Sequence, residues 1–122
     1  IIPGNGGTQR LSRIIGMAKA LELILLAKRL SALEGLKVGV LHAVCPPRHS
    51  LSYGTVWANK IAAAGSIAIG EAKHAIRGGI DLKLDDGLQF EVECYKSVLH
   101  SKDRMEGLRA FTEKRKPVYV GE

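Results

Sequence analysis

Residues 84–99 read LDDGLQFEVECYKSVL, and this stretch carries the clearest structural signal in the chain. Its apolar side chains recur at intervals of 4, 4, 3 and 4 residues, at Leu84, Leu88, Val92, Tyr95 and Leu99. Such spacing places side chains on one face of an α-helix. We therefore expect a long amphipathic helix, whose apolar face needs a partner surface.

The segments on both sides of this stretch also have helical spacing. Apolar residues mark helices within 53–64 and 69–76, and Gly78-Gly79 closes the second of them. After residue 99, Ser101 with Asp103 suits the start of a last helix, because a hydroxyl cap and an early acid favour a helix N-terminus. Pro117 ends that helix.

The N-terminal part contains a tight turn and several short elements. Gly4-Asn5-Gly6-Gly7 predicts a turn, and Thr8 is placed to cap the helical segments that follow, up to about residue 26. Ser31 and Glu34 form a capping box, with a hydroxyl at the N-cap and a carboxylate three residues later. The apolar run 40–44 fits a short strand.

Length and composition indicate one soluble, mostly helical domain. The chain has 122 residues, of which 46% are hydrophobic and 25% charged. No apolar run approaches the ~20 residues needed to cross a bilayer. Cys45 and Cys94 are too few for a disulfide framework, so we expect reduced, buried thiols in an intracellular compartment. The net charge of +6 favours anionic partners, including phosphates and nucleic acid.

Residue patterns alone predict no catalytic or metal site. The glycine turn lacks both the third glycine of a dinucleotide fingerprint and the Lys-Ser/Thr of a phosphate loop. His42, Cys45 and His49 match no usual zinc spacing. The basic run 114–116 is favoured at a helix C-terminus without any ligand, although a phosphate or RNA contact stays open.

Two longer motifs identify a family. Residues 3–13, PGNGGTQRLSR, resemble the Pro-Gly-x-Gly-Gly-Thr-Gln-Arg-Leu-Pro-Arg segment of the enoyl-CoA hydratase/isomerase (crotonase) family. Residues 103–117, DRMEGLRAFTEKRKP, resemble its C-terminal segment Asp-x-x-Glu-Gly-x-x-Ala-Phe-x-Glu-Lys-Arg-x-Pro. The resemblance covers the whole chain, and its nearest branch looks like the methylglutaconyl-CoA and mitochondrial-type enoyl-CoA hydratases.

The resemblance implies a fold and an assembly. The family combines an α/β spiral of ββα turns with C-terminal helices that form a trimer and cover the acyl-CoA site. This chain, mostly α as it stands, corresponds to the last spiral turn plus the trimerisation helices. Residues 1–49 would end the spiral core, and residues 50–122 would form the trimerisation and CoA-covering region. A homotrimer or a dimer of trimers, and a mitochondrial or else cytoplasmic location, follow from the same resemblance.

The resemblance also implies chemistry. Family hydratases use two glutamates around one water, and two backbone N–H groups hold the thioester oxygen. All four correspond to segments before Ile1, so no catalytic residue, no metal and no cofactor beyond substrate CoA is expected here. Five binding residues do carry over: Pro3 and Gly4 beside the water, Tyr95 at the acyl pocket, and Phe111 and Lys114 at the adenosine and phosphate end of CoA.

Several departures from the family pattern bear on stability. Ala27-Lys28 stands where the family has Thr-Gly at a helix end, and Gly35 replaces a helical alanine at a cost of about 1 kcal/mol. Gly54 and Gly70 also fall inside expected helices. Two alternatives to a hydratase part stay open. The missing glutamates and the extra helical glycines would fit a non-catalytic family member that acts through oligomerisation, and the net charge of +6 would fit a basic RNA-binding module.

Overall fold

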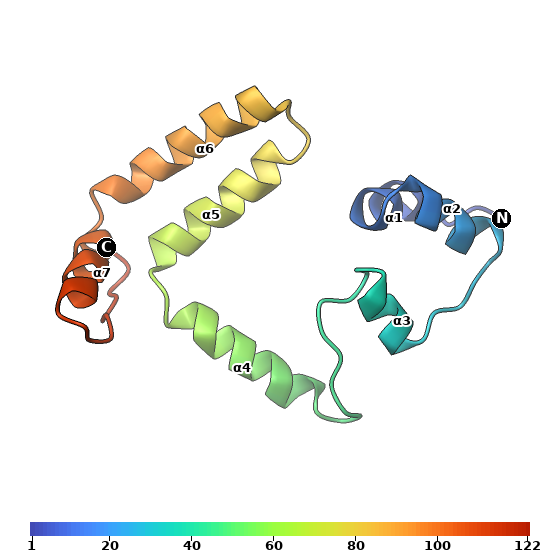
Figure 1. Ribbon diagram of the computed structural model, residues 1–122, viewed down its shortest axis with the longest axis horizontal. Coiled ribbons are helices and arrows are strands. Elements are labelled where there is room, and N and C mark those ends of the chain that lie inside the picture. Colours follow the sequence, from blue (N-terminus) through green and yellow to red (C-terminus); the bar gives the residue numbers. More distant parts are fainter. The chain divides into compact units, whose positions relative to one another are not determined.

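The computed structural model describes residues 1–122, and every regular element in it is an α-helix (Figure 1). The helices are α1 (Gly7–Ile15), α2 (Met17–Leu25), α3 (Ala32–Lys37), α4 (Ser50–Ala62), α5 (Ser66–Gly79), α6 (Leu84–Leu99) and α7 (Lys102–Thr112). The mostly α prediction is therefore confirmed, and the long helix expected over residues 84–99 is α6.

The chain divides into two compact units, Ile1–Ser50 and Leu51–Glu122. In the first unit α1 packs against α2. The glycine turn is present, since the N–H of Gly7 donates to the carbonyl of Gly4 at 3.1 Å. The prediction that Thr8 caps α1 is wrong, because Asn5 and Gly6 take left-handed conformations and Gly6 becomes the N-cap, which places Thr8 inside the helix.

The helix α2 ends in a recognisable hydrogen-bond pattern, which is repeated after α3, where the N–H of Val40 donates to Gly35. After α2 the N–H of Lys28 donates to Leu23, and Ala27 between them has a φ of +47°. This is a Schellman ending with alanine at the position that normally favours glycine. The replacement of the family's helix-ending glycine pattern by Ala27-Lys28 thus leaves alanine in a left-handed conformation.

The capping box of α3 is confirmed, with both of its hydrogen bonds between Ser31 and Glu34 present.

The short strand expected over residues 40–44 is wrong. The N–H groups of Val40 and Leu41 both donate to the carbonyl of Gly35, so this segment wraps around the end of α3. The same contact explains Gly35, which is buried. A Cβ there would lie 3.2 Å from Leu41 Cδ1, so the glycine makes room for the leucine.

In the second unit, α5 and α6 lie side by side as an antiparallel hairpin (Figure 1). The two helices approach closely at Gly79 and Gly87, where a Cβ on Gly87 would lie 3.5 Å from the Gly79 carbonyl oxygen. The ring of Phe90 lies over Gly78, and a Cβ there would lie only 2.3 Å from it. These contacts fix the register between the two helices.

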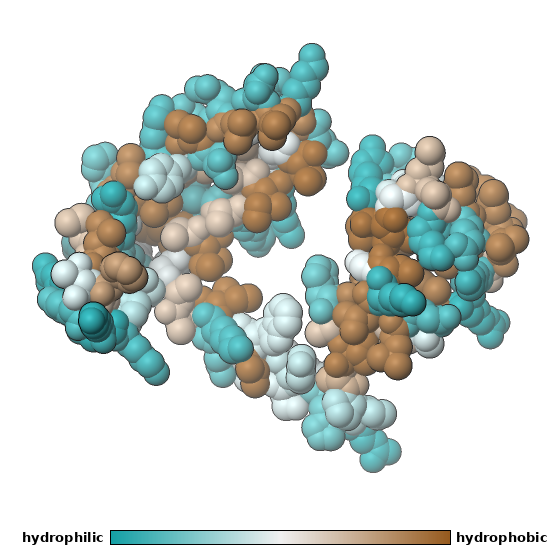
Figure 2. All heavy atoms as spheres, in the orientation of Figure 1, coloured by the Kyte–Doolittle hydropathy of each residue, from teal (hydrophilic) through white to brown (hydrophobic).

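The chain leaves most of its apolar surface uncovered. Only Ala20, Leu23, Cys94 and Ala110 are buried hydrophobic residues. Hydrophobic side chains lie at the surface of both units (Figure 2). The apolar helix faces therefore need further protein surface to form a full core.

Candidate functional site

The last residues of the chain fold back along α7, and we call residues 115–121 the strap. Residues of the C-terminal motif, 103–117, hold it in place. Ser101 caps α7 by accepting from the N–H of Arg104, which confirms the predicted hydroxyl cap. The buried carboxylate of Asp103 accepts from the N–H groups of Val120 at 2.7 Å and Gly121 at 3.0 Å. The segment after Pro117 is thereby folded back onto the start of α7.

Glu106 holds the other end of the strap. Its two carboxylate oxygens accept from the guanidinium of Arg115 at 2.6 and 2.9 Å, and one of them also accepts from the N–H of Val118. The Arg115 guanidinium, followed by this N–H, lowers the pKa of Glu106 from 4.5 to about 2. Beside it Gly107 lets Tyr119 approach, since a Cβ there would lie 3.2 Å from the tyrosine oxygen.

Phe111 and Lys114 are the two residues of this motif for which the resemblance implies a ligand. Phe111 lies near the end of α7 with an exposed fraction of 85%. Lys114 occupies the Schellman position of the same helix with a φ of +54°, while the N–H of Arg115 donates to the carbonyl of Ala110 at 3.0 Å. The two residues lie close together, because the N–H of Lys114 donates to the Phe111 carbonyl at 3.3 Å.

Pro3 and Gly4 lie in the first unit, at the turn before α1. Both are exposed. Pro3 folds over Gly7, where a Cβ would lie only 2.9 Å from the Pro3 Cβ. No atom would meet a Cβ built on Gly4 within 4 Å, so its side is open to solvent within this chain.

Tyr95 lies on α6 at the edge of a shallow apolar hollow between α5 and α6, with an exposed fraction of 57%. The hollow has a volume of about 360 Å³, and its lining includes Ala72, Ile76 and Val98. Two acidic side chains, Glu71 and Glu91, and the thiol of Cys94 also face it. Tyr95 thus stands on a concave surface, on a different helix from Phe111 and Lys114.

Sequence reasoning missed a cluster of possible metal ligands between α5 and α6. The ligand atoms of Glu71, His74 and Cys94 all lie within 4.8 Å of one another. Burial, followed by the charge of Glu71, raises the pKa of the Cys94 thiol. Glu71 and His74 are three residues apart on one helix, which is the only signal in the sequence, because Cys94 joins them only through the register of α5 against α6. His42, Cys45 and His49, which match no usual zinc spacing in the sequence, are not among these ligands and form no cluster of their own.

Cys94 is buried and free, as expected, whereas Cys45 is only half-buried. No helix in the chain has the length and apolar character to cross a membrane.

Comparison with known proteins defines the class. The helices superpose on an enoyl-CoA hydratase from Bacillus anthracis with a TM-score of 0.94 at 49% sequence identity, covering all of this chain and 47% of that one. The fold is thus the helical part of a crotonase-type protein. The enoyl-CoA hydratase/isomerase family model matches residues 1–122, so the chain belongs to this family.

Curated relatives support the same assignment. The chain is 41% identical over 121 residues to the probable enoyl-CoA hydratase 2, mitochondrial, of Arabidopsis thaliana, covering 99% of this chain and 40% of that protein. It is 44% identical over 126 residues to the mitochondrial methylglutaconyl-CoA hydratase of Rattus norvegicus, covering 100% and 40%. The chain therefore spans less than half the length of these relatives.

Proposed function

We propose that this chain is part of an acyl-CoA hydratase that adds water to 2-enoyl-CoA thioesters in fatty-acid or branched-chain amino-acid breakdown. In this proposal its share is to bind CoA and to form subunit contacts. Family membership over residues 1–122 supports the reaction class. Relatives with this activity in their names include mitochondrial and bacterial proteins, and we propose a mitochondrial location from the former.

The observation that carries the CoA-binding role is the division of labour within the C-terminal motif. Asp103, Glu106 and Arg115 are used by hydrogen bonds that hold the strap. The Phe111 side chain does not help to hold the strap, since 85% of it is exposed. Lys114 even adopts a backbone conformation that disfavours side chains. CoA binding would account for both residues: the Phe111 ring would stack on the adenine, and the Lys114 ammonium would bind a phosphate.

The other binding residues follow the family pattern. Tyr95 stands at an apolar hollow that could take part of an acyl chain, and Gly4 presents an open turn where a substrate could approach the backbone closely. We propose that Pro3 and Gly4 lie beside the catalytic water. The two glutamates that bracket this water would come from family segments outside residues 1–122, so the chain alone is proposed to bind without turnover.

The subunit contacts are proposed to include α4. None of its residues is buried, and its apolar side chains recur on one face: Tyr53, Val56, Trp57 and Ile61. Each of these is about half exposed, with values from 47% to 54%. Burying such a stripe against further protein would stabilise the assembly by about 25 cal/mol for each Å² removed from water. A trimer, or a dimer of trimers, is the proposed assembly.

A CoA titration tests the proposal. The purified protein is titrated with CoA by isothermal calorimetry, beside the variants Phe111→Ala and Lys114→Ala. Each variant should weaken binding by about tenfold, which corresponds to 1.4 kcal/mol. Lys116→Ala removes an equal charge two residues away and should leave the affinity unchanged. No heat with CoA, or equal loss in all three variants, would contradict the CoA-binding role.

The net charge of +6 makes RNA an alternative partner to CoA, and the same purified protein can be tested for RNA binding. Filter binding of a single-stranded RNA is measured against salt concentration. Phosphate-driven RNA binding would give a steep negative slope of log K against log salt. The proposal expects only weak binding to RNA, and no loss of it in Phe111→Ala.

A further inference from the structure

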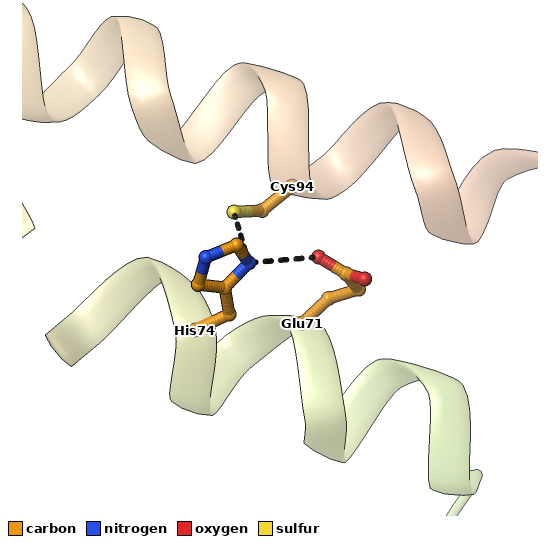
Figure 3. Close-up of side chains that lie close together, drawn as sticks. All are labelled: Glu71, His74 and Cys94. Atoms are coloured by element: carbon orange, nitrogen blue, oxygen red, sulfur yellow. Dashed lines mark hydrogen bonds and ion pairs between the residues drawn. The ribbon is translucent and has the colours of Figure 1, made fainter. Parts of the chain in front are cut away.

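Three side chains of different chemistry converge on one point between α5 and α6 (Figure 3). The Nδ1 atom of His74 lies 3.9 Å from Cys94 Sγ and 3.8 Å from Glu71 Oε2. The thiol is almost fully buried, whereas the imidazole is 65% exposed, so the point can be reached from solvent. The cluster therefore combines a sulfur, a nitrogen and an oxygen ligand.

The geometry does not suit nucleophilic catalysis. A Cys-His-acid triad needs the thiol and the carboxylate on opposite nitrogens of the imidazole, so that one nitrogen takes the proton while the other is oriented. Here both neighbours face the same atom, Nδ1 of His74. Three ligand atoms gathered around one point can instead hold a metal ion.

The ligand types and distances fit zinc. Zn²⁺ is bound by thiolate at about 2.3 Å, imidazole nitrogen at about 2.0 Å and carboxylate oxygen at about 2.1 Å, in tetrahedral geometry. Tetrahedral angles then place sulfur and nitrogen about 3.5 Å apart, nitrogen and oxygen about 3.3 Å apart, and sulfur and oxygen about 3.6 Å apart. The separations of 3.9 and 3.8 Å exceed these values by a few tenths of an ångström, and all three ligand atoms lie within 4.8 Å of one another, so side-chain rotations would bring them around one ion. We propose that Glu71, His74 and Cys94 form a zinc site that joins α5 to α6.

Neighbouring side chains support this site. The ring of Phe90 packs edge-on against His74, with the ring centroids 5.0 Å apart and an interplanar angle of 86°. This contact restricts the imidazole. Glu91 lines the same hollow one turn before Cys94, which leaves either its carboxylate or a water for the fourth position. The site would hold the two helices together. Glu71 and Cys94 line the same hollow as Tyr95, but the zinc titration tests the site independently of the proposed acyl-CoA function.

The experiment is a titration of the purified, reduced protein with Zn²⁺ in competition with a chromophoric chelator, followed by a titration with Co²⁺. One equivalent of Zn²⁺ should bind, and Co²⁺ should produce the near-ultraviolet charge-transfer absorption that reports a thiolate ligand. Cys94→Ser should abolish this absorption. His74→Gln should weaken Zn²⁺ binding by ~100-fold or more, since even indirect partners of a metal cost 10–100-fold.

Two controls give the result its meaning. Cys45→Ser removes the other thiol, and Glu93→Gln removes a carboxylate next to Cys94 that pairs with Lys96 instead. Both should bind Zn²⁺ as the parent protein does. A helical circular dichroism spectrum in every variant excludes misfolding as the cause. Absence of one-equivalent binding, or loss of the cobalt absorption in Cys45→Ser and not in Cys94→Ser, would overturn the site.

Discussion

Lys114 offers a substitution whose effects on stability and on binding should have opposite signs. Its φ of +54° lies in the left-handed region, which costs a residue with a side chain roughly 1–2 kcal/mol. Glycine removes this cost, but it also makes the unfolded chain more flexible, which destabilises the folded state by about 0.4–1 kcal/mol. Lys114→Gly should therefore stabilise the protein by about 0.5–1 kcal/mol. The backbone hydrogen bonds of the helix end need no change.

The same variant removes the ammonium that we assign to a CoA phosphate, so its affinity for CoA should fall by about tenfold. Ala27→Gly is the matched control: its φ is +47° in an equivalent helix ending, and no CoA contact is proposed for it. It should gain similar stability and keep full affinity. Urea unfolding followed by circular dichroism and calorimetric titration with CoA measure the two quantities. A Lys114→Gly protein that is more stable yet binds CoA equally would refute the assigned role.

Four further substitutions test the packing, the strap and the assembly. Gly78→Ala should destabilise the α5–α6 hairpin, because its Cβ would lie 2.3 Å from Phe90, whereas Gly54→Ala meets no atom and should stabilise α4 by up to about 1 kcal/mol; thermal unfolding compares the two. Glu106 has a folded pKa of about 2 against an ordinary 4.5, so its contribution to stability is complete above pH 4.5 and declines as the pH falls toward 2. Glu106→Gln should remove that part of the acid dependence, and acid titrations at fixed urea that superpose for both proteins would contradict it. Trp57→Asp should reduce the oligomer mass in light scattering while CoA contacts stay intact, and an unchanged mass would place the interface elsewhere.

Local signals in the sequence predicted local structure well. The caps at Ser31 and Ser101 were correct because a cap depends only on a hydroxyl and the three residues after it. Thr8 failed because the preceding residues took left-handed conformations and started α1 earlier. The run 40–44 failed because an apolar segment without a neighbouring strand has nothing to pair with, and here its N–H groups turn back to Gly35.

Features that depend on two helices could not be predicted. Glu71 and His74 share a face of α5, but nothing in the sequence places Cys94 opposite them, since that needs the close approach at Gly79 and Gly87. Asp103 was predicted to favour the start of α7 through its charge, and it does lie there. Its hydrogen bonds to Val120 and Gly121 required the fold-back of the last residues.

Hydration of crotonyl-CoA tests the central claim most directly. Loss of the enoyl-thioester absorbance is followed with the 122-residue chain alone, at a concentration where calorimetry shows CoA bound. Because we propose that these helices bind CoA while the two catalytic glutamates come from outside residues 1–122, the absorbance should stay constant. Steady turnover by the chain alone would mean that its own residues perform the reaction, and would contradict the account.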